Sequence, residues 1–141
     1  MATTKVAAQG WELYVTVPAG AEHQVLNLKS SGPAADSATK QDTSDFTLGA
    51  FRQHMKIATG TTIPFSCWWM EDGGAFDAGQ GDILTLGRDH GSAGVGSFRW
   101  VSPEGYELAG DGTVVLTGYG GGSYEGVSEL NFEVECTEEW T

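Results

Sequence analysis

The stretch that most constrains this chain runs from residue 113 to residue 137 and reads TVVLTGYGGGSYEGVSELNFEVECT. Its second half alternates between apolar and polar residues, and this period of two predicts a strand with one face in a core and the other in water. The first half is rich in β-branched residues, which favour strands, and the glycines between the halves permit a tight reversal. The inward positions are Leu130, Phe132, Val134 and Cys136, and the outward positions are Glu129, Asn131, Glu133 and Glu135. The stretch therefore predicts a long C-terminal β-hairpin with carboxylates on its outward face.

The length of the chain fits one domain spanning residues 1–141. A chain of 141 residues buries roughly 68–70% of its unfolded surface, so it needs no disulfide to be stable. Cys67 and Cys136 each lie within a strand pattern, which favours two reduced, buried thiols over a disulfide between neighbouring strands. The 21 glycines lack a triplet period, and with scattered Thr and Val they predict many short strands and turns.

The charge of the chain is strongly acidic. Seven Lys and Arg stand against 19 Asp and Glu, giving a net charge of −12, and the nine acids from residue 101 onward are accompanied by no Lys or Arg. This balance argues against a protein that grips nucleic acid, because phosphate binding draws on basic side chains. The N-terminus lacks a basic segment followed by an apolar core, and no run reaches the roughly 18 apolar residues of a membrane span. We therefore expect a protein made in the cytosol.

Two strands are expected before the first long connection. One covers residues 11–17, and the other covers residues 23–29 with Leu26 and Leu28 inward. Residues 30–59 are predicted to be a long loop, because their first part, SSGPAADSATKQDTSD, is polar and far longer than the usual connection of about 4–6 residues. Apolar residues follow at Phe46, Leu48, Phe51 and Met55. Either they cover the end of a sheet, or the loop is an assembly arm that orders against a neighbouring subunit; the residues alone leave both readings open.

Residues 61–70 predict a further strand, whose inward positions are Ile63, Phe65, Cys67 and Trp69. Pro64 removes one backbone donor, which predicts an edge or a bulge at that point. Trp68 and Met70 would point the other way, toward a second layer or a partner. The core is the favoured place for one of the two tryptophans, and apolar residues on both faces also indicate an interface.

A short helix is expected at about residues 77–88. Asp77 is placed to cap it, Gln80 to complete a capping box three residues later, and Phe76, Ile83 and Leu84 form an apolar stripe.

Short strands are expected after the helix, at residues 97–102 and 106–108, with Gly110-Asp111-Gly112 as a turn leading into the C-terminal hairpin. One small helix among many antiparallel strands predicts a mostly β subunit, an antiparallel β-sandwich or a barrel-like sheet.

No pattern in the sequence is specific enough to predict a catalytic or metal-binding site. Residues 37–40 fit the S-x-x-K pattern, but they lie in a polar segment rather than at a helix start. The glycine cluster at 118–122 lacks the Lys-Ser/Thr ending of a phosphate loop, and the histidines and cysteines do not pair at zinc spacing. We expect no enzymatic activity, metal or cofactor, and a small hydrolase is the least favoured class.

The order of these segments resembles the major tail tube proteins of long, non-contractile-tailed bacteriophages, the siphophage tail tube family. The resemblance covers nearly the whole chain and rests on order rather than on one motif. The segments are an Ala/Thr-rich opening into a strand (4–17), a polar loop (36–45), a glycine-led strand (60–70), a DAGQ helix (77–86), the FRWVSPEGYEL hairpin (98–108), a strand with a glycine turn (113–122) and an alternating last strand (127–137). The acidic last strand and the Trp68-Trp69 pair depart from the family pattern.

The resemblance implies a structural virion protein with the phage tail tube fold. Its subunits would join into rings, resembling hexamers, whose inner sheets close into one barrel. The rings would stack into a tube around a tape-measure protein, and DNA would later pass through the lumen without specific binding. Tail terminator and distal tail proteins would be further partners, no membrane would be involved, and a protein assembled in the bacterial host cytoplasm would end in the virion tail.

The same resemblance gives roles to particular residues. Acids on the last strand would face the lumen, where a negative wall keeps DNA sliding; alternatively they lie outside and aid solubility. The candidate lumen acids are Glu129, Glu133 and Glu135, the candidate inter-ring contacts are Phe46, Leu48, Phe51 and Met55, and the candidate interface aromatics are Trp68, Tyr119 and Tyr124. The alternative function is a carbohydrate- or receptor-binding β-sandwich module, since exposed Trp and Tyr residues would suit stacking against sugars.

Overall fold

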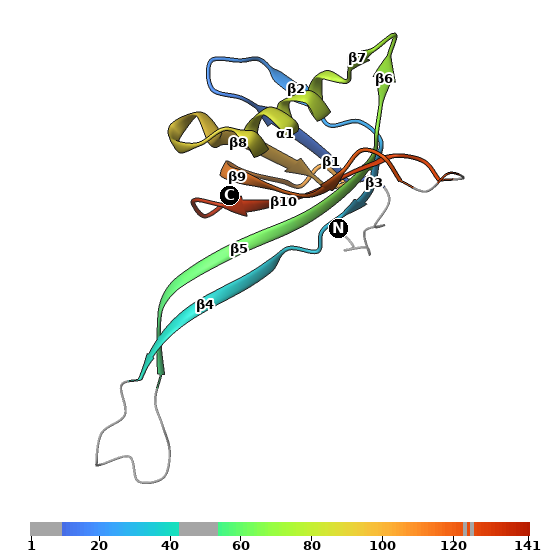
Figure 1. The fold of residues 1–141 in the computed structure, drawn as a ribbon. Coiled ribbons are helices and arrows are strands. Elements are labelled where there is room, and N and C mark those ends of the chain that lie inside the picture. Colours follow the sequence, from blue (N-terminus) through green and yellow to red (C-terminus); the bar gives the residue numbers. More distant parts are fainter. Residues whose placement is uncertain (1–9, 43–53, 123, 125) are drawn as a thin grey trace, which may run out of the picture.

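The computed structural model describes residues 10–42, 54–122, 124 and 126–141. Eight strands form one antiparallel sheet in the order β2-β1-β8-β9-β10-β5-β3, with β4 alongside β5, while β6 and β7 form a small separate hairpin (Figure 1). The elements are β1 (Glu12–Thr16), β2 (Glu22–Gln24), β3 (Leu28–Ser31), β4 (Ala35–Asp42), β5 (His54–Trp68), β6 (Glu71–Asp72), β7 (Ala75–Phe76), α1 (Ala78–Arg88), the 3-10 helix η2 (Gly91–Gly94), β8 (Val95–Val101), β9 (Glu107–Tyr119) and β10 (Glu129–Cys136). The prediction of a mostly β, antiparallel subunit with one short helix is confirmed.

One face of the sheet forms the core, and helix α1 lies over it (Figure 1). Most inward positions predicted for the strands β5 and β10 are buried, namely Ile63, Phe65, Cys67, Leu130, Phe132 and Val134, whereas the predicted inward positions Trp69 and Cys136 are half-buried. Leu13 and Val15 of β1 are buried as well. The Phe65 ring lies 5.8 Å from Trp100 and 5.4 Å from Phe132 between ring centroids. The Trp100 indole N–H donates to Ser31 Oγ at 2.7 Å, which joins β8 to β3 across the core. The sheet therefore curls into a barrel-like shape.

Helix α1 begins as predicted, but it is held differently. Asp77 is its N-cap and accepts from the Gln80 backbone N–H at 3.2 Å. The Gln80 side chain does not return to Asp77 to complete a capping box. It is fully buried, its Oε1 accepts from the Met70 N–H at 3.0 Å, and its Nε2 donates to the carbonyls of Leu26 and Trp68 at 3.2 and 2.7 Å. Leu26 and Met70 lie outside the strands and Trp68 is the last residue of β5, so the side chain satisfies backbone groups where strand pairing ends.

The second predicted strand is divided into two. β2 ends at Gln24, and β3 begins at Leu28. Val25 is buried, whereas Leu26, predicted to point inward, is 41% exposed. Asn27 adopts a left-handed backbone conformation with φ 56°, which interrupts the alternation on which the prediction rested.

The turn predicted at Gly110-Asp111-Gly112 does not form. β9 runs through it without a break from Glu107 to Tyr119. These glycines provide space rather than a reversal: a Cβ at Gly110 would lie 2.4 Å from Cδ1 of Trp140. The Trp140 ring stacks on Phe98 with centroids 5.8 Å apart, and its indole N–H donates to the Asp111 carbonyl at 2.9 Å.

The described part of the segment predicted to be a loop, residues 30–42 and 54–59, is mostly strand. β4 pairs with the first part of β5 from Ala35↔Thr62 to Asp42↔His54, and the two strands form a ribbon that extends away from the body (Figure 1). We call this ribbon, residues 35–42 and 54–61, the arm. Its residues from Ala35 to Ala38 are all exposed. The alternation that reveals a half-buried strand is therefore missing here, because no face of this part of the ribbon lies against a core.

The strand β5 contains Pro64 next to a break in its pairing. Residues 32–34 separate β3 from β4, and the Gly32 N–H donates to the Pro64 carbonyl at 2.8 Å. The proline thus lies where the neighbouring ladder is already interrupted, as the sequence predicted.

Candidate functional site

The face of the sheet opposite the core is polar, and its strand residues are half-buried or exposed. We call it the open face. It carries the outward positions of β1, β2, β8, β9 and β10, which register places side by side. Its acids are Glu12, Glu22, Glu107, Asp111, Glu129, Glu133 and Glu135, and the basic residues paired with some of them are Lys29 and Arg99. The net charge of this surface is therefore negative.

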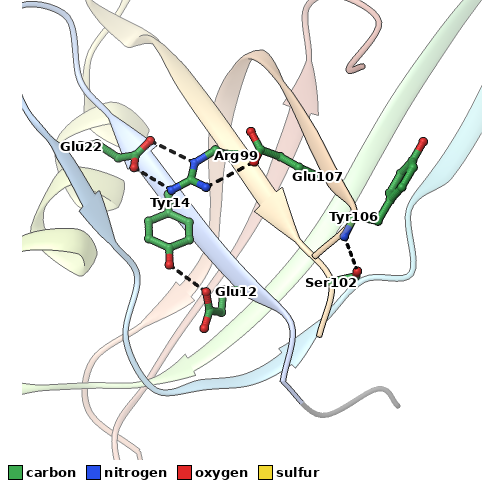
Figure 2. Close-up of polar contacts among 7 residues, drawn as sticks. All are labelled: Glu12, Tyr14, Glu22, Arg99, Ser102, Tyr106 and Glu107. Atoms are coloured by element: carbon green, nitrogen blue, oxygen red, sulfur yellow. Dashed lines mark hydrogen bonds and ion pairs between the residues drawn. The ribbon is translucent and has the colours of Figure 1, made fainter. Parts of the chain in front are cut away.

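Arg99 lies among the acids at one side of the open face (Figure 2). Its Nη2 contacts Glu22 Oε1 at 2.9 Å and its Nη1 contacts Glu107 Oε2 at 3.3 Å, while its guanidinium carbon lies 4.1 Å from the centroid of the Tyr14 ring. The hydrogen bonds to Glu22 are the largest cause that raises the pKa of Arg99. The Tyr14 hydroxyl donates to Glu12 at 2.7 Å, and this bond raises the pKa of Tyr14. The single guanidinium thus ties β8 to both β2 and β9.

Lys29 forms the second ion pair of this surface, with Glu129. Its Nζ also lies 4.7 Å from the centroid of the Trp68 ring. The hydrogen bond from Lys29 lowers the pKa of Glu129, so this carboxylate is ionised but locally neutralised.

The other two candidate lumen acids differ from Glu129. Glu133 and Glu135 lie opposite Pro64 and Thr62 of β5 on one side and Val115 and Thr113 of β9 on the other. Within the described residues, no basic side chain pairs with either carboxylate. All three acids therefore lie on one face of β10. The two acids without a basic partner among the described residues, Glu133 and Glu135, give that face its negative charge.

The candidate interface aromatics gather at the end of the sheet where β5 and β9 finish. Trp68 and Tyr119 line one groove with Val127 and the glycines of the β9–β10 turn, and Tyr124 lies fully exposed in the same turn. Arg88 donates to the Tyr119 hydroxyl at 3.1 Å. Sequence reasoning missed Val127, which is 64% exposed.

The candidate inter-ring contacts fall largely beyond what the structure describes. Phe46, Leu48 and Phe51 lie outside the described residues, and for Met55 only its place in strand β5 is described.

The catalytic and metal-binding patterns weighed in the sequence find no support among the described residues. Among the described residues, no group of three or more His, Cys, Asp or Glu is placed to hold a metal ion. Ser37 and Lys40 lie in strand β4 rather than at a helix start. Both cysteines are free, and burial raises the pKa of Cys67 to about 12 and that of Cys136 to about 11. In the described part of the chain, no helix has the length and apolar character to cross a membrane.

Comparison with solved structures places this fold among tail proteins. A chain in the virion of a native gene transfer agent particle aligns with a TM-score of 0.64 at 12% identity, covering 92% of this chain and 95% of that one. A chain in the tail of an empty gene transfer agent particle, obtained with helical refinement and C6 symmetry, gives 0.62 at 14%, covering 92% and 93%. A chain of the SPP1 tail tube gives 0.67 at 12%, covering 96% and 78%. No family model and no curated protein matches the sequence. The resemblance to tail tube proteins is thus confirmed at the level of the fold.

Proposed function

We propose that this chain is the structural subunit of a tail tube, a non-enzymatic virion protein whose rings stack into a hollow tube that delivers DNA. The observation that carries the proposal is the fold shared over 92–96% of the chain with chains from a virion, a tail and a tail tube. The C6 symmetry of the gene transfer agent tail supports a ring of six copies here as well.

The edges of the sheet support ring formation. The sheet ends at β2 on one side and at β3 with β4 on the other. Exposed strand edges invite pairing with other chains, and closing a sheet on itself removes them. In a ring, the β2 edge of one copy would meet the β3–β4 edge of the next, which is a heterologous contact that closes by rotation.

In this tube the open face lines the lumen. At physiological ionic strength, charges act over about 8 Å, so only acids on the wall itself repel DNA. Among the candidate lumen acids, Glu133 and Glu135 contribute most to this repulsion, and Glu129 contributes less because Lys29 neutralises it.

Charge reversal tests the lumen assignment. Glu133→Lys combined with Glu135→Lys should slow DNA ejection from assembled particles, because a basic wall holds phosphate. The matched control is Glu104→Lys with Glu139→Lys, which reverses two exposed acids that are not among those of the open face. Equal speeds of DNA ejection for the unmodified protein, the Glu133→Lys/Glu135→Lys variant and the control variant would show that Glu133 and Glu135 do not face the lumen.

The remaining roles follow from the tube itself. The arm would contact the adjacent ring, a tape-measure protein would occupy the lumen during assembly, and terminator and distal tail proteins would be further tail partners. The protein would be assembled in the cytoplasm of a bacterial host and reside in the virion tail.

Electron microscopy of the purified chain at rising concentration tests the function directly. We expect rings and then tubes in negative stain. Monodisperse monomers at every concentration would refute the proposal. If those monomers also melted at a higher temperature with a glycan present, the carbohydrate-binding alternative would be favoured, with the exposed aromatics at Trp68 and Tyr119 as its platform.

A further inference from the structure

Strand β9 continues past the end of its neighbour β10. The pairing of β10 with β9 ends at Cys136, which lies opposite Gly112, whereas β8 pairs with β9 as far as Glu107. Within the described residues, positions 107–111 of β9 therefore have a paired strand on one side alone. The backbone groups on the other side need partners, because an open strand edge invites pairing with another chain.

Residues 137–141, which we call the strap, follow β10 along this edge in an irregular conformation. The Thr137 N–H donates to the Asp111 carbonyl at 3.1 Å, and the Asp111 N–H donates to Oε1 of Glu138 at 3.0 Å. Two residues further along β9, Ala109 and Thr141 exchange both of their backbone hydrogen bonds at 3.1 Å. The strap thus satisfies the backbone groups that the end of β10 leaves open.

One side chain anchors the strap. The Trp140 ring stacks on Phe98 with centroids 5.8 Å apart, and its indole N–H donates to the Asp111 carbonyl at 2.9 Å. The ring lies against two glycines of β9: a Cβ at Gly110 would lie 2.4 Å from its Cδ1, and a Cβ at Gly112 would lie 3.4 Å from its Cζ2. The bare backbone of β9 therefore forms a notch that fits an indole ring.

The rest of the strap is held weakly. All of its residues except the half-buried Trp140 are exposed. A hollow of about 410 Å³ lies between the strap and the base of the arm, where Asp36 and Thr61 form the opposite wall. Segments with few buried contacts open at a lower free energy than the whole fold. The strap is therefore built to leave β9 while the core stays folded.

We propose that the strap is a latch, which while closed prevents the edge of β9 from pairing with the same edge of a second copy. Trp140 sets how rarely the latch opens. Two such edges are complementary, because antiparallel strands related by a twofold axis exchange equivalent hydrogen bonds. Covering an edge with a loop is one way in which proteins avoid this pairing. The inference concerns the separate subunit and does not depend on the tail tube function.

Hydrogen exchange of the unmodified chain tests whether the latch opens by itself. The Ala109 amide donates to the strap, whereas Val134 lies in the middle of the sheet between β5 and β9. We expect the protection factor of the Ala109 amide to be at least about tenfold lower than that of the Val134 amide. Trp140→Ala should lower the first more than the second. Equal protection of the two amides would mean that the strap opens only with the whole fold, and would overturn the proposal.

A reversible disulfide tests what opening does. Ala109→Cys and Thr141→Cys are combined with Trp140→Ala in a Cys136→Ser background, where the remaining Cys67 is fully buried. Residues that exchange both hydrogen bonds have Cα atoms about 5.5 Å apart, a separation that a disulfide can span. The oxidised protein holds the strap closed and the reduced protein releases it, so the two states compared have the same sequence.

Sedimentation at about 0.5 M salt, where the repulsion between copies of charge −12 is screened, measures the association. We expect the reduced form to dimerise at a concentration at least about tenfold lower than the oxidised form, with the amide at position 109 protected again in the dimer. The matched control Glu139→Ala, at an exposed strap position, should behave as the unmodified chain.

Three results would overturn the latch. They are equal association of the oxidised and reduced forms, a dimer in which the amide at position 109 stays unprotected, and loss of the folded circular dichroism spectrum on reduction. Absence of tubes from the unmodified chain would refute the tail tube function and leave the latch standing. The two proposals therefore fail separately.

Discussion

Gln80 holds together the connection between β2 and β3, the last residue of β5 and the residues just after it, so its replacement by Leu should lower the stability of the fold. The change keeps the volume of the side chain but removes its bonds to the Met70 N–H and to the Leu26 and Trp68 carbonyls. Leaving a buried polar group unpaired costs about 1–3 kcal/mol, which gives an upper bound of roughly 9 kcal/mol for three groups. Water reaches these backbone groups once the chain relaxes, because Leu26 and Trp68 are partly exposed. We therefore expect a loss of about 3 kcal/mol in the free energy of unfolding.

Urea denaturation followed by tryptophan fluorescence measures this loss. The midpoint should fall while the slope stays constant, and a loss of about 3 kcal/mol should lower the melting temperature by about 10 °C. The control is Thr85→Val on the exposed side of the same helix, where the hydroxyl only donates back to Gly81 at 3.0 Å; it should change stability by less than about 0.5 kcal/mol. A Gln80→Leu protein that loses less than about 1 kcal/mol would refute the reasoning, because water would then replace all three bonds without cost.

Two further predictions concern the core. Gly110→Ala places a methyl group 2.4 Å from Trp140 and should lower the free energy of unfolding by about 1–3 kcal/mol. In a Trp140→Ala background the same change should cost less than half as much. A double-mutant cycle without coupling between the two positions would contradict the role assigned to this glycine. The Cys67 thiol should resist iodoacetamide at pH 8 until the protein unfolds and should react more slowly than Cys136, because it is fully buried and its pKa is about 12. Since that pKa lies above the ordinary value of 9.0, the stability linked to Cys67 is complete below pH 9 and falls as the pH rises toward 12; a Cys67→Ala variant should lack this part of the alkaline loss.

The sequence predicted strands well where one face of the strand meets the core. In β1, β5 and β10 the alternation of apolar and polar residues is visible, because one face of each strand lies against the core and the other does not. The arm escaped prediction for the opposite reason: residues from Ala35 to Ala38 are exposed on both faces, so no alternation marks them. Gly110 was wrongly predicted to lie in a turn. The position suits glycine because the ring of Trp140, 30 residues later in the chain, occupies the space that a Cβ would need. Glycine in a sequence does not distinguish a turn from a place where another side chain needs room.

The candidate site was predictable in its acids but not in its ion pairs. The outward row of β10 follows from period two alone. The partner of Glu129 is Lys29, 100 residues away, and only the curled sheet brings them together. Arg99 gave a visible signal, since it is a lone base between Phe98 and Trp100 on a strand of an acidic chain, but its position between Glu22 and Glu107 depends on the order of β2, β1, β8 and β9.

The charge of the chain and the edges of its sheet act together in the proposed assembly. A subunit with a net charge of −12 repels its own copies, and this repulsion disfavours any contact in which two acidic open faces meet. The sheet ends in two different edges, β2 on one side and β3 with β4 on the other. In the proposed ring the β2 edge of one copy would meet the β3–β4 edge of the next, so two copies could not fill both edges by pairing with each other, and each addition would leave the same edge open until the ring closes. Unlike edges on an acidic subunit therefore favour a closed ring over a dimer.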